Sequence, residues 1–360
     1  MVELGLQPME GDHLETFQGV IFSVKGPLHP PGYVVAFPKY YPSPEGSRVR
    51  GGRRYAKLVS LKDFYSYVER NCPQYLRFDP VLGGEVIQVP RFHIARYHTP
   101  TQALAQLAEK DKLDPVEKDI LQMALFFKEA AGIPLSDLGV SGSVMLGLHS
   151  STSDIDLVIY GEENCRKAYR VLSQLRGKEG APIQPFTDGE LAGLYQSRVA
   201  DTPMDFELFL QVEKRKVLQG KFCGRGYSLR LLKKRGELGE EYGAVKYRPL
   251  GSVEIEAVVA EDGEAVFTPC RYLLEEVSFL RGEAPGLVAE IVSHRGRFCE
   301  QARRWEKIRV LGKLEKVVSS ERERFRLLVG SAPGDFFFPL PPLEGVRSRA
   351  ERRQSGQLEK

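Results

Sequence analysis

Cysteine is scarce in this chain and is spread along it. Five cysteines occur among 360 residues, and no two of them form a CxxC pair. Structural zinc sites draw on such closely spaced pairs, and disulfide frameworks use more cysteines in shorter chains. The cysteine pattern therefore speaks against a structural zinc site and indicates a reduced compartment.

Long apolar runs are missing as well. No stretch approaches the ~18–20 uninterrupted apolar residues that a membrane-spanning helix needs. The opening sequence, MVELGLQPMEGDHLE, is acidic and lacks the apolar core of a secretion signal. We therefore expect a cytoplasmic protein that does not bind a membrane.

A large excess of either charge is also absent. The net charge is +3, in a chain of which 28% of residues are charged and 42% are hydrophobic. That balance is typical of a globular protein, and the length predicts two or three domains. Because the overall charge is small, any affinity for nucleic acid must come from local basic patches.

Short apolar runs and helical stretches divide the chain into four parts and predict an α+β protein. Residues 1–98 predict a small mixed α/β domain, and 99–245 a domain with a mixed sheet and flanking helices. Residues 246–340 hold five short β runs that resemble an OB-like barrel, a fold that often binds single-stranded nucleic acid. Residues 341–360 predict a flexible charged tail.

Local signals predict the elements of the second part. A helix begins after Asp114, with Pro115 at its first position and Glu117 completing a capping box, and it ends at Gly132. The sequences LGV and DIDLVIY predict strands, and ENCRKAYRVLSQLRGK predicts a helix. TPMDFELFLQV predicts a third strand, because its apolar and acidic residues alternate.

Two aspartates stand in a strand that otherwise reads as buried. Asp154 and Asp156 in DIDLVIY project to one face, about 7 Å apart along the strand. Buried carboxylates cost stability unless they are compensated, and Mg²⁺ or Mn²⁺ prefers such oxygen ligands. Asp205 or Glu207, again two residues apart on a predicted strand, would complete the cluster. The pattern predicts two metal ions that activate an attacking oxygen and stabilise a leaving pyrophosphate.

A phosphate-binding segment is predicted upstream of the two aspartates. Gly142 and Ser143 follow a predicted strand and precede a helical turn, where backbone N–H groups can approach a phosphate closely. The Ser143 hydroxyl adds a donor for a terminal phosphate, and Ser153 joins this nucleotide-binding set. His149, which lies between them, is more typical of a structural loop residue.

The order of these motifs resembles a known signature. A Gly-Ser pair, an eleven-residue step to DID and a later acidic strand are similar to the DNA polymerase beta–type nucleotidyltransferase superfamily. More broadly, the chain resembles uncharacterised archaeal predicted nucleotidyltransferases. The resemblance covers about residues 139–210. It implies that Asp154 and Asp156 bind metal, that Asp205 binds the catalytic metal and helps to deprotonate the attacking hydroxyl, and that Gly142-Ser143 holds the triphosphate. The long N-terminal extension departs from tRNA CCA-adding enzymes, so CCA addition is not implied.

Basic residues interleaved with aromatic ones mark a candidate path for an acceptor. The stretch 213–235 follows the predicted third strand and includes Phe222 and Tyr227. This mixture suits phosphate contacts and base stacking, whereas Lys/Arg runs are otherwise solvated surface. The predicted nucleic-acid-binding residues are Lys214, Arg215, Lys221, Arg225, Lys233, Lys234 and Arg235.

Together these features predict a metal-dependent enzyme that transfers a nucleoside monophosphate from an NTP to an acceptor hydroxyl and releases pyrophosphate. RNA is the preferred acceptor. Two alternatives stay open: transfer to a protein or small-molecule hydroxyl, and an inactive RNA-binding protein on the same fold, against which the intact acids argue. Neither the base nor the oligomeric state follows from the sequence.

Overall fold

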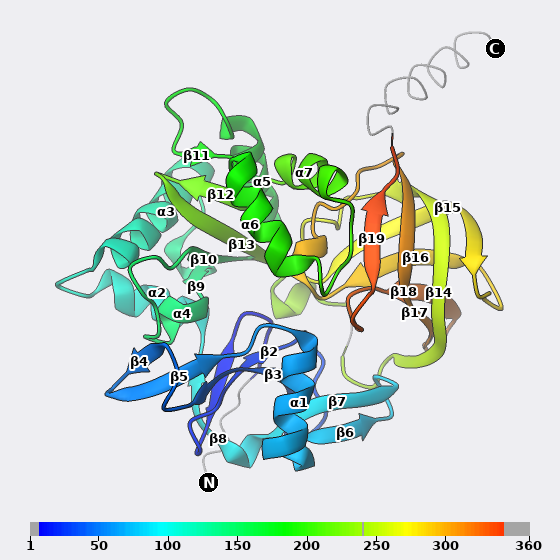
Figure 1. The fold of residues 1–360 in the computed structure, drawn as a ribbon, viewed down its shortest axis with the longest axis horizontal. Coiled ribbons are helices and arrows are strands. Elements are labelled where there is room, and N and C mark those ends of the chain that lie inside the picture. The colour runs from blue at the N-terminus through cyan, green and yellow to red at the C-terminus, as the bar shows by residue number, and fades with distance from the viewer. Residues whose placement is uncertain (1–6, 240, 342–360) are drawn as a thin grey trace. The chain divides into compact units, whose positions relative to one another are not determined.

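The computed structural model describes residues 7–239 and 241–341, and these form two compact units. The first unit comprises the chain up to Glu190 together with Val217–Val245, and the second comprises Leu191–Lys216 and the chain from Lys246 onward. The described residues contain seven α-helices and several β-sheets (Figure 1), which confirms the predicted α+β class. None of these helices has the length and apolar character needed to cross a membrane. The predicted tail lies outside the described residues from position 342 onward.

An eight-stranded sheet occupies the N-terminal part of the first unit. Its strands are β1 (His13–Thr16), β2 (Ile21–Val24), β3 (Tyr33–Pro42), β4 (Arg48–Arg50), β5 (Arg53–Lys57), β6 (Leu76–Asp79), β7 (Gly84–Pro90) and β8 (Ile94–His98). They pair in the order β4-β5-β3-β2-β1-β8, and β7 joins β3 to β6. Helix α1 (Leu61–Asn71) is capped by Ser60 and packs Phe64 and Val68 into a core with this sheet.

A five-stranded sheet forms the centre of the first unit. Its strands are β9 (Leu138–Val140), β10 (Ile155–Tyr160), β11 (Ile183–Gln184), β12 (Gln219–Phe222) and β13 (Arg225–Leu232). They pair in the order β11-β12-β13-β10-β9, with β10 parallel to β13 and antiparallel to β9. The strand predictions for LGV and DIDLVIY are therefore confirmed.

Four helices accompany this sheet. They are α2 (Pro100–Ala108), α3 (Pro115–Ala131), α4 (Gly142–Met145) and α5 (Glu162–Leu175). Helix α3 begins as predicted, because Asp114 and Glu117 form a reciprocal capping box, and it ends at Gly132 in the left-handed conformation. Both α3 and α5 contact β10. The apolar residues of the central strand are thereby buried: Ile155, Leu157, Val158 and Ile159.

The segment after α6 (Asp188–Arg198) is helical, so the prediction of a strand at TPMDFELFLQV is wrong. Helix α7 (Phe206–Lys214) begins at Asp205 and buries Leu208 and Val212, which lie one turn apart. A short apolar run fits both the two-residue period of a strand and the 3.6-residue period of a helix. The signals that decide between them here are those of a helix. They are an aspartate N-cap, a glutamate in the first turn and a lysine in the last.

The second unit contains the predicted C-terminal β-rich region. Its strands are β14 (Lys246–Glu261), β15 (Cys270–Arg281), β16 (Val288–Ser293), β17 (Lys307–Val318), β18 (Glu323–Leu328) and β19 (Phe336–Pro339). The first five pair in a ring, β14-β15-β16-β18-β17 and back to β14, and the β16–β18 pair is parallel. Strand β19, which the sequence analysis did not predict, pairs with β17.

Candidate metal and nucleotide site

Two carboxylates stand together at the start of the central strand of the first unit. Asp154 directly precedes β10 and is exposed, and Asp156 is its second residue and is half-buried. Ile155 and Leu157, which alternate with them, are buried. Loss of hydration raises the pKa of Asp154, and the charge of Asp156 raises it further. Negative charge at Asp154 is therefore unfavourable in the protein alone, and a cation bound beside it would relieve that cost.

Two glycines make the space that these carboxylates fill. A Cβ atom at Gly142 would lie 2.0 Å from Oδ2 of Asp156, and one at Gly226 would lie 2.5 Å from Oδ1 of Asp154. Gly142 also has a φ of 64°, which favours glycine. The sequence predicted a glycine here for the approach of a phosphate. The structure gives it a further reason, which is the approach of the backbone to a carboxylate.

The predicted nucleotide-binding residues lie next to the acids. Ser143 Oγ donates to Ser153 Oγ at 3.4 Å, and Ser153 Oγ accepts from the Ser150 N–H at 3.0 Å. Ser153 itself is buried directly before Asp154. The α4 segment and the loop that leads into β10 thus bring hydroxyl and amide groups to the carboxylate pair.

Ser228 is a site residue that the sequence analysis missed. On β13 it is the register partner of Asp156, and its hydroxyl donates to Asp156 Oδ1 at 2.7 Å. The adjacent parallel strand therefore presents a hydroxyl, and not a third acid, to the carboxylate. The alternation of YSLRLL could have marked β13 as a strand, but not its pairing with β10.

The proposed third acid lies on a different kind of element from the one predicted. Asp205 is the N-cap of α7, and its carboxylate accepts from the Leu208 N–H at 3.0 Å. Glu207 lies in the first turn of that helix. Residues two apart do not share a helix face. The argument that Asp205 and Glu207 project together from a strand is therefore wrong.

The cap gives a stability prediction for Asp205. We expect Asp205→Ala to lower the free energy of unfolding by about 1 kcal/mol, because a donor at the start of α7 loses its acceptor. Asp205→Asn should stay within a few tenths of a kcal/mol, since asparagine caps equally well. Urea unfolding measures both changes. A loss in the asparagine variant as large as in the alanine variant would contradict the capping role.

Cations of the N-terminal sheet act on the carboxylate pair. Burial lowers the pKa of Lys39 on β3 and the charges of nearby Lys57 and Lys25 add to the shift, so that the pKa falls to about 7 against the opposing effect of Asp156. The charge of Lys57 offsets part of the rise in the pKa of Asp154. Residues 1–98 received no role in the sequence analysis, because only the fold brings β3 and β5 near β10.

Two arginines of the same sheet hold the segment that follows α4. Arg50 Nη1 donates to the carbonyl of Leu146 at 3.3 Å, and Arg48 Nη1 to that of Leu148 at 3.5 Å. Arg50 is itself fixed by Glu15, with an N···O distance of 2.6 Å. The N-terminal sheet thus supports the Gly-Ser segment as well as supplying charge near the acids.

Arg225, predicted to contact nucleic acid, holds the loop before the acids. Its Nη1 donates to the carbonyls of Ser151 at 3.0 Å and Ser153 at 3.1 Å, and its Nε pairs with Asp119 at 2.5 Å. The position fits a residue that orients Asp154, which follows the loop directly.

Most other residues of the predicted basic path are in ion pairs. The pairs are Lys221 with Glu190, Lys233 with Glu162, Lys234 with Asp137 and Arg215 with Glu306. Lys214 ends α7, and Arg235 is exposed at the start of a short 3₁₀ helix. The acidic partners of these cations lie far from them in the sequence. The sequence alone therefore did not show that ion pairs neutralise most of the basic stretch.

A second cluster of possible metal ligands has a structural explanation. Donor atoms of Asp114, Glu117 and His149 lie within 4.8 Å of one another. Asp114 and Glu117 are the capping box of α3, and both oxygens of Glu117 accept from Lys110 at 2.7 Å. His149 Nε2 lies 2.7 Å from the Asp114 carboxylate. His149 therefore ties its loop to the helix cap, as expected for a structural residue.

The chain is similar to an archaeal protein along most of its length. It is 30% identical over 330 residues to the uncharacterised protein MJ1086 of Methanocaldococcus jannaschii, and the alignment covers 89% of this chain and 94% of that protein. No protein-family model matches the chain. No solved structure matches it either.

Proposed function

We propose that this chain, which belongs to the same family as the uncharacterised Methanocaldococcus jannaschii protein, is a metal-dependent nucleotidyltransferase. It transfers a nucleoside monophosphate from an NTP to an acceptor hydroxyl and releases pyrophosphate. The observation that carries the proposal is the pair Asp154 and Asp156. Two glycines leave room for these carboxylates, and Gly142, Ser143 and Ser153 lie beside them.

The donor set fits Mg²⁺ or Mn²⁺. Asp154 and Asp156 offer only hard oxygen ligands, which these ions prefer. When bound, the metal would neutralise charge on the transferred phosphate and activate the attacking oxygen. Ser228 holds one oxygen of Asp156 and so fixes the orientation of that carboxylate. We keep Asp205, or alternatively Glu207, as the proposed third ligand. The two residues do not lie on a strand, so strand geometry does not support this choice.

The protein's other contribution is to bind and orient the triphosphate. Backbone N–H groups and the Ser143 hydroxyl would contact the phosphates. Lys57 and the protonated form of Lys39 supply positive charge on the side of the N-terminal sheet. Phosphoryl transfer depends mainly on positioning and charge neutralisation. Carboxylates, hydroxyls and lysines are the kinds of group that such a site needs.

RNA is our preferred acceptor. In support, the ring of strands in the second unit, with its parallel β16–β18 pair, resembles OB-like barrels, which often bind single-stranded nucleic acid. A protein or small-molecule hydroxyl is the second candidate acceptor. It is favoured by the ion pairs that neutralise Lys221, Lys233 and Lys234.

A basic-residue variant separates these acceptors. If RNA follows the stretch 213–235, replacing Lys233, Lys234 and Arg235 by alanine removes phosphate contacts and leaves the carboxylates in place. Each lost contact to a single strand lowers the log–log salt slope of binding by about 0.7. We therefore expect weaker and less salt-sensitive RNA binding, measured at two or more salt concentrations. Unchanged slopes and affinities would remove this segment from the acceptor path.

Incubation with labelled NTPs tests the function itself. The chain would be mixed with each α-labelled NTP, Mg²⁺ or Mn²⁺, and either total RNA or total protein. We expect metal-dependent transfer of label to one acceptor class, abolished by EDTA. Failure with every NTP and both acceptor pools, together with no rise in melting temperature on adding NTP and Mg²⁺, would favour an inactive binding protein.

A further inference from the structure

Two exposed phenylalanines lie on neighbouring segments at one end of the eight-stranded sheet of the first unit (blue to cyan in Figure 1). Phe17 directly follows β1 and is 71% exposed, and Phe92 lies just before β8 and is 69% exposed. The antiparallel pairing of β1 with β8 brings the two segments together, and the Phe17 N–H donates to the carbonyl of His93 at 3.2 Å. Single exposed apolar side chains are common, whereas neighbouring exposed aromatic residues indicate a contact surface.

Hydrogen bonds and ring contacts hold the backbone that carries both phenylalanines. The first lies in the turn between β1 and β2, which is closed by a hydrogen bond of 2.8 Å from the Gly19 N–H to the carbonyl of Thr16. The ring of Phe92 meets that of His93 edge-on, with 4.5 Å between the centroids. His93 Nδ1 in turn lies 2.8 Å from the hydroxyl of Tyr75, which is buried. Because these segments are already ordered, a ligand that binds the rings loses less free energy to ordering them.

Two arginines without acidic partners lie on the same segments of the sheet. Arg53 reaches the β1–β2 turn, where its Nη2 donates to the carbonyl of Gln18 at 3.4 Å, and Arg96 on β8 is the register partner of Glu15. Both arginines are exposed, and neither forms an ion pair with any residue that the structure describes. Glu15 does not neutralise Arg96, because its carboxylate is buried and pairs with Arg50 at 2.6 Å.

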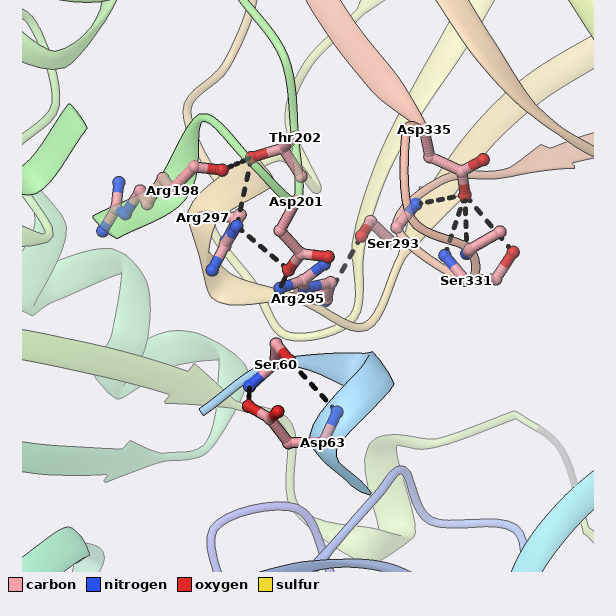
Figure 2. Close-up of polar contacts among 12 residues, drawn as sticks. Ser60, Asp63, Arg198, Asp201, Thr202, Ser293, Arg295, Arg297, Ser331 and Asp335 are labelled. Carbon is pink, nitrogen blue, oxygen red and sulfur yellow. Dashed lines mark hydrogen bonds and ion pairs between the residues drawn. The ribbon is translucent and has the colours of Figure 1, made fainter. Parts of the chain in front are cut away.

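Several arginines elsewhere in the chain are held by acids. In the second unit Asp201 pairs with both Arg295 and Arg297 (Figure 2), and on β17 Arg309 pairs with Glu254 at 2.7 Å. Ion pairs also neutralise most of the predicted basic path in residues 213–235. The arginines at the end of the eight-stranded sheet are instead open to solvent or to a bound partner, and the partner that they favour carries negative charge.

We propose that this end of the sheet, formed by Phe17, Phe92, Arg53 and Arg96, binds single-stranded RNA. Bases stack on exposed aromatic rings whatever their sequence, and arginines contact the phosphates of the same strand. An apolar protein partner would cover the rings but leave both arginines unpaired, so the surface favours a ligand that combines flat rings with negative charge. The proposal rests on RNA as the acceptor in the proposed function, and it adds a place on residues 1–98 where the strand is held.

RNA binding by the full chain, in EDTA and without NTP, tests this surface separately from catalysis. The probe is a fluorescently labelled single-stranded RNA of about ten nucleotides, titrated at two salt concentrations. We expect Phe17→Ala and Phe92→Ala each to weaken binding about fivefold or more, because each variant removes a ring on which a base stacks. Arg96→Gln should lower the log–log salt slope by about 0.7, because it removes one phosphate contact.

Phe78→Ala is the matched control. Phe78 is also 69% exposed, but it lies on β6 opposite Glu85, an exposed acid that repels phosphate. This variant should bind the probe within about twofold of the wild type, and all three phenylalanine variants should keep the wild-type melting temperature because their rings are mostly exposed.

Three results would overturn the proposal: wild-type affinity in both Phe17→Ala and Phe92→Ala, an equal loss in Phe78→Ala, or no RNA binding by the wild type. Metal-dependent transfer of label to protein in that last case would show a transferase whose acceptor is not RNA. Conversely, RNA binding that depends on Phe17 and Phe92, without any transfer of label, would support the surface and contradict the transferase. The two failures are therefore distinguishable.

Discussion

Asp156→Asn is expected to slow nucleotidyl transfer by more than about a hundredfold while the protein remains folded. Asparagine keeps the shape of the side chain and an oxygen that can accept from Ser228, so the strand pairing should persist. It removes the charge that a metal ion requires. Single-turnover rates with a labelled NTP measure the loss, and Glu163→Gln, an exposed acid on α5, is the matched control. Transfer at the wild-type rate in Asp156→Asn would contradict the metal-dependent mechanism.

Thermal unfolding gives a second readout that needs no acceptor. Because the pKa of Asp154 is raised in the fold, ionisation of this group favours the unfolded state, and its contribution to stability is lost as pH rises through the folded pKa. At neutral pH without metal, Asp154→Asn should therefore melt at or above the wild-type temperature. Mg²⁺ with NTP should stabilise the wild type and not the variant. A clear fall in melting temperature without metal would contradict the repulsion between the two acids.

The strand at DIDLVIY could be predicted because the information for it is local. A strand with period-two side chains places Asp154 and Asp156 on one side whatever the rest of the fold does. The helix from Pro115 to Ala131 was predictable for the same reason, since Asp114 and Glu117 are three residues apart and cap each other.

The parts that could not be predicted depend on pairing between distant segments. Ser228 faces Asp156 only because β13 lies parallel to β10, and Lys39 acts on the acids only because β3 lies near them. No periodicity reports such pairings. The error at Asp205 is different in kind: a nine-residue apolar pattern fits two periods, and the capping signal should have outweighed the alternation.

Gly142→Ala should disable the site by displacing the Asp156 carboxylate. Its new Cβ would lie 2.0 Å from Asp156 Oδ2, so either the carboxylate or the α4 segment must move. We expect a loss of transfer of about a hundredfold, because metal and triphosphate positions shift together. The melting-temperature gain from Mg²⁺ and NTP should also shrink.

Gly147→Ala is the control that separates the clash from backbone strain. Its φ of 63° nearly equals the 64° of Gly142, so alanine carries the same conformational cost of about 1 kcal/mol at either position. A Cβ at Gly147 would meet only the Arg50 side chain, with Cδ at 3.6 Å and Cγ at 3.7 Å, which are ordinary contact distances. Gly147→Ala should therefore lose similar strain energy, measured by urea unfolding, and keep transfer within a few-fold of wild type. If both variants lost transfer equally, strain in the α4 segment rather than displacement of Asp156 would be the cause, and the close fit of Gly142 to the carboxylate would have no catalytic meaning.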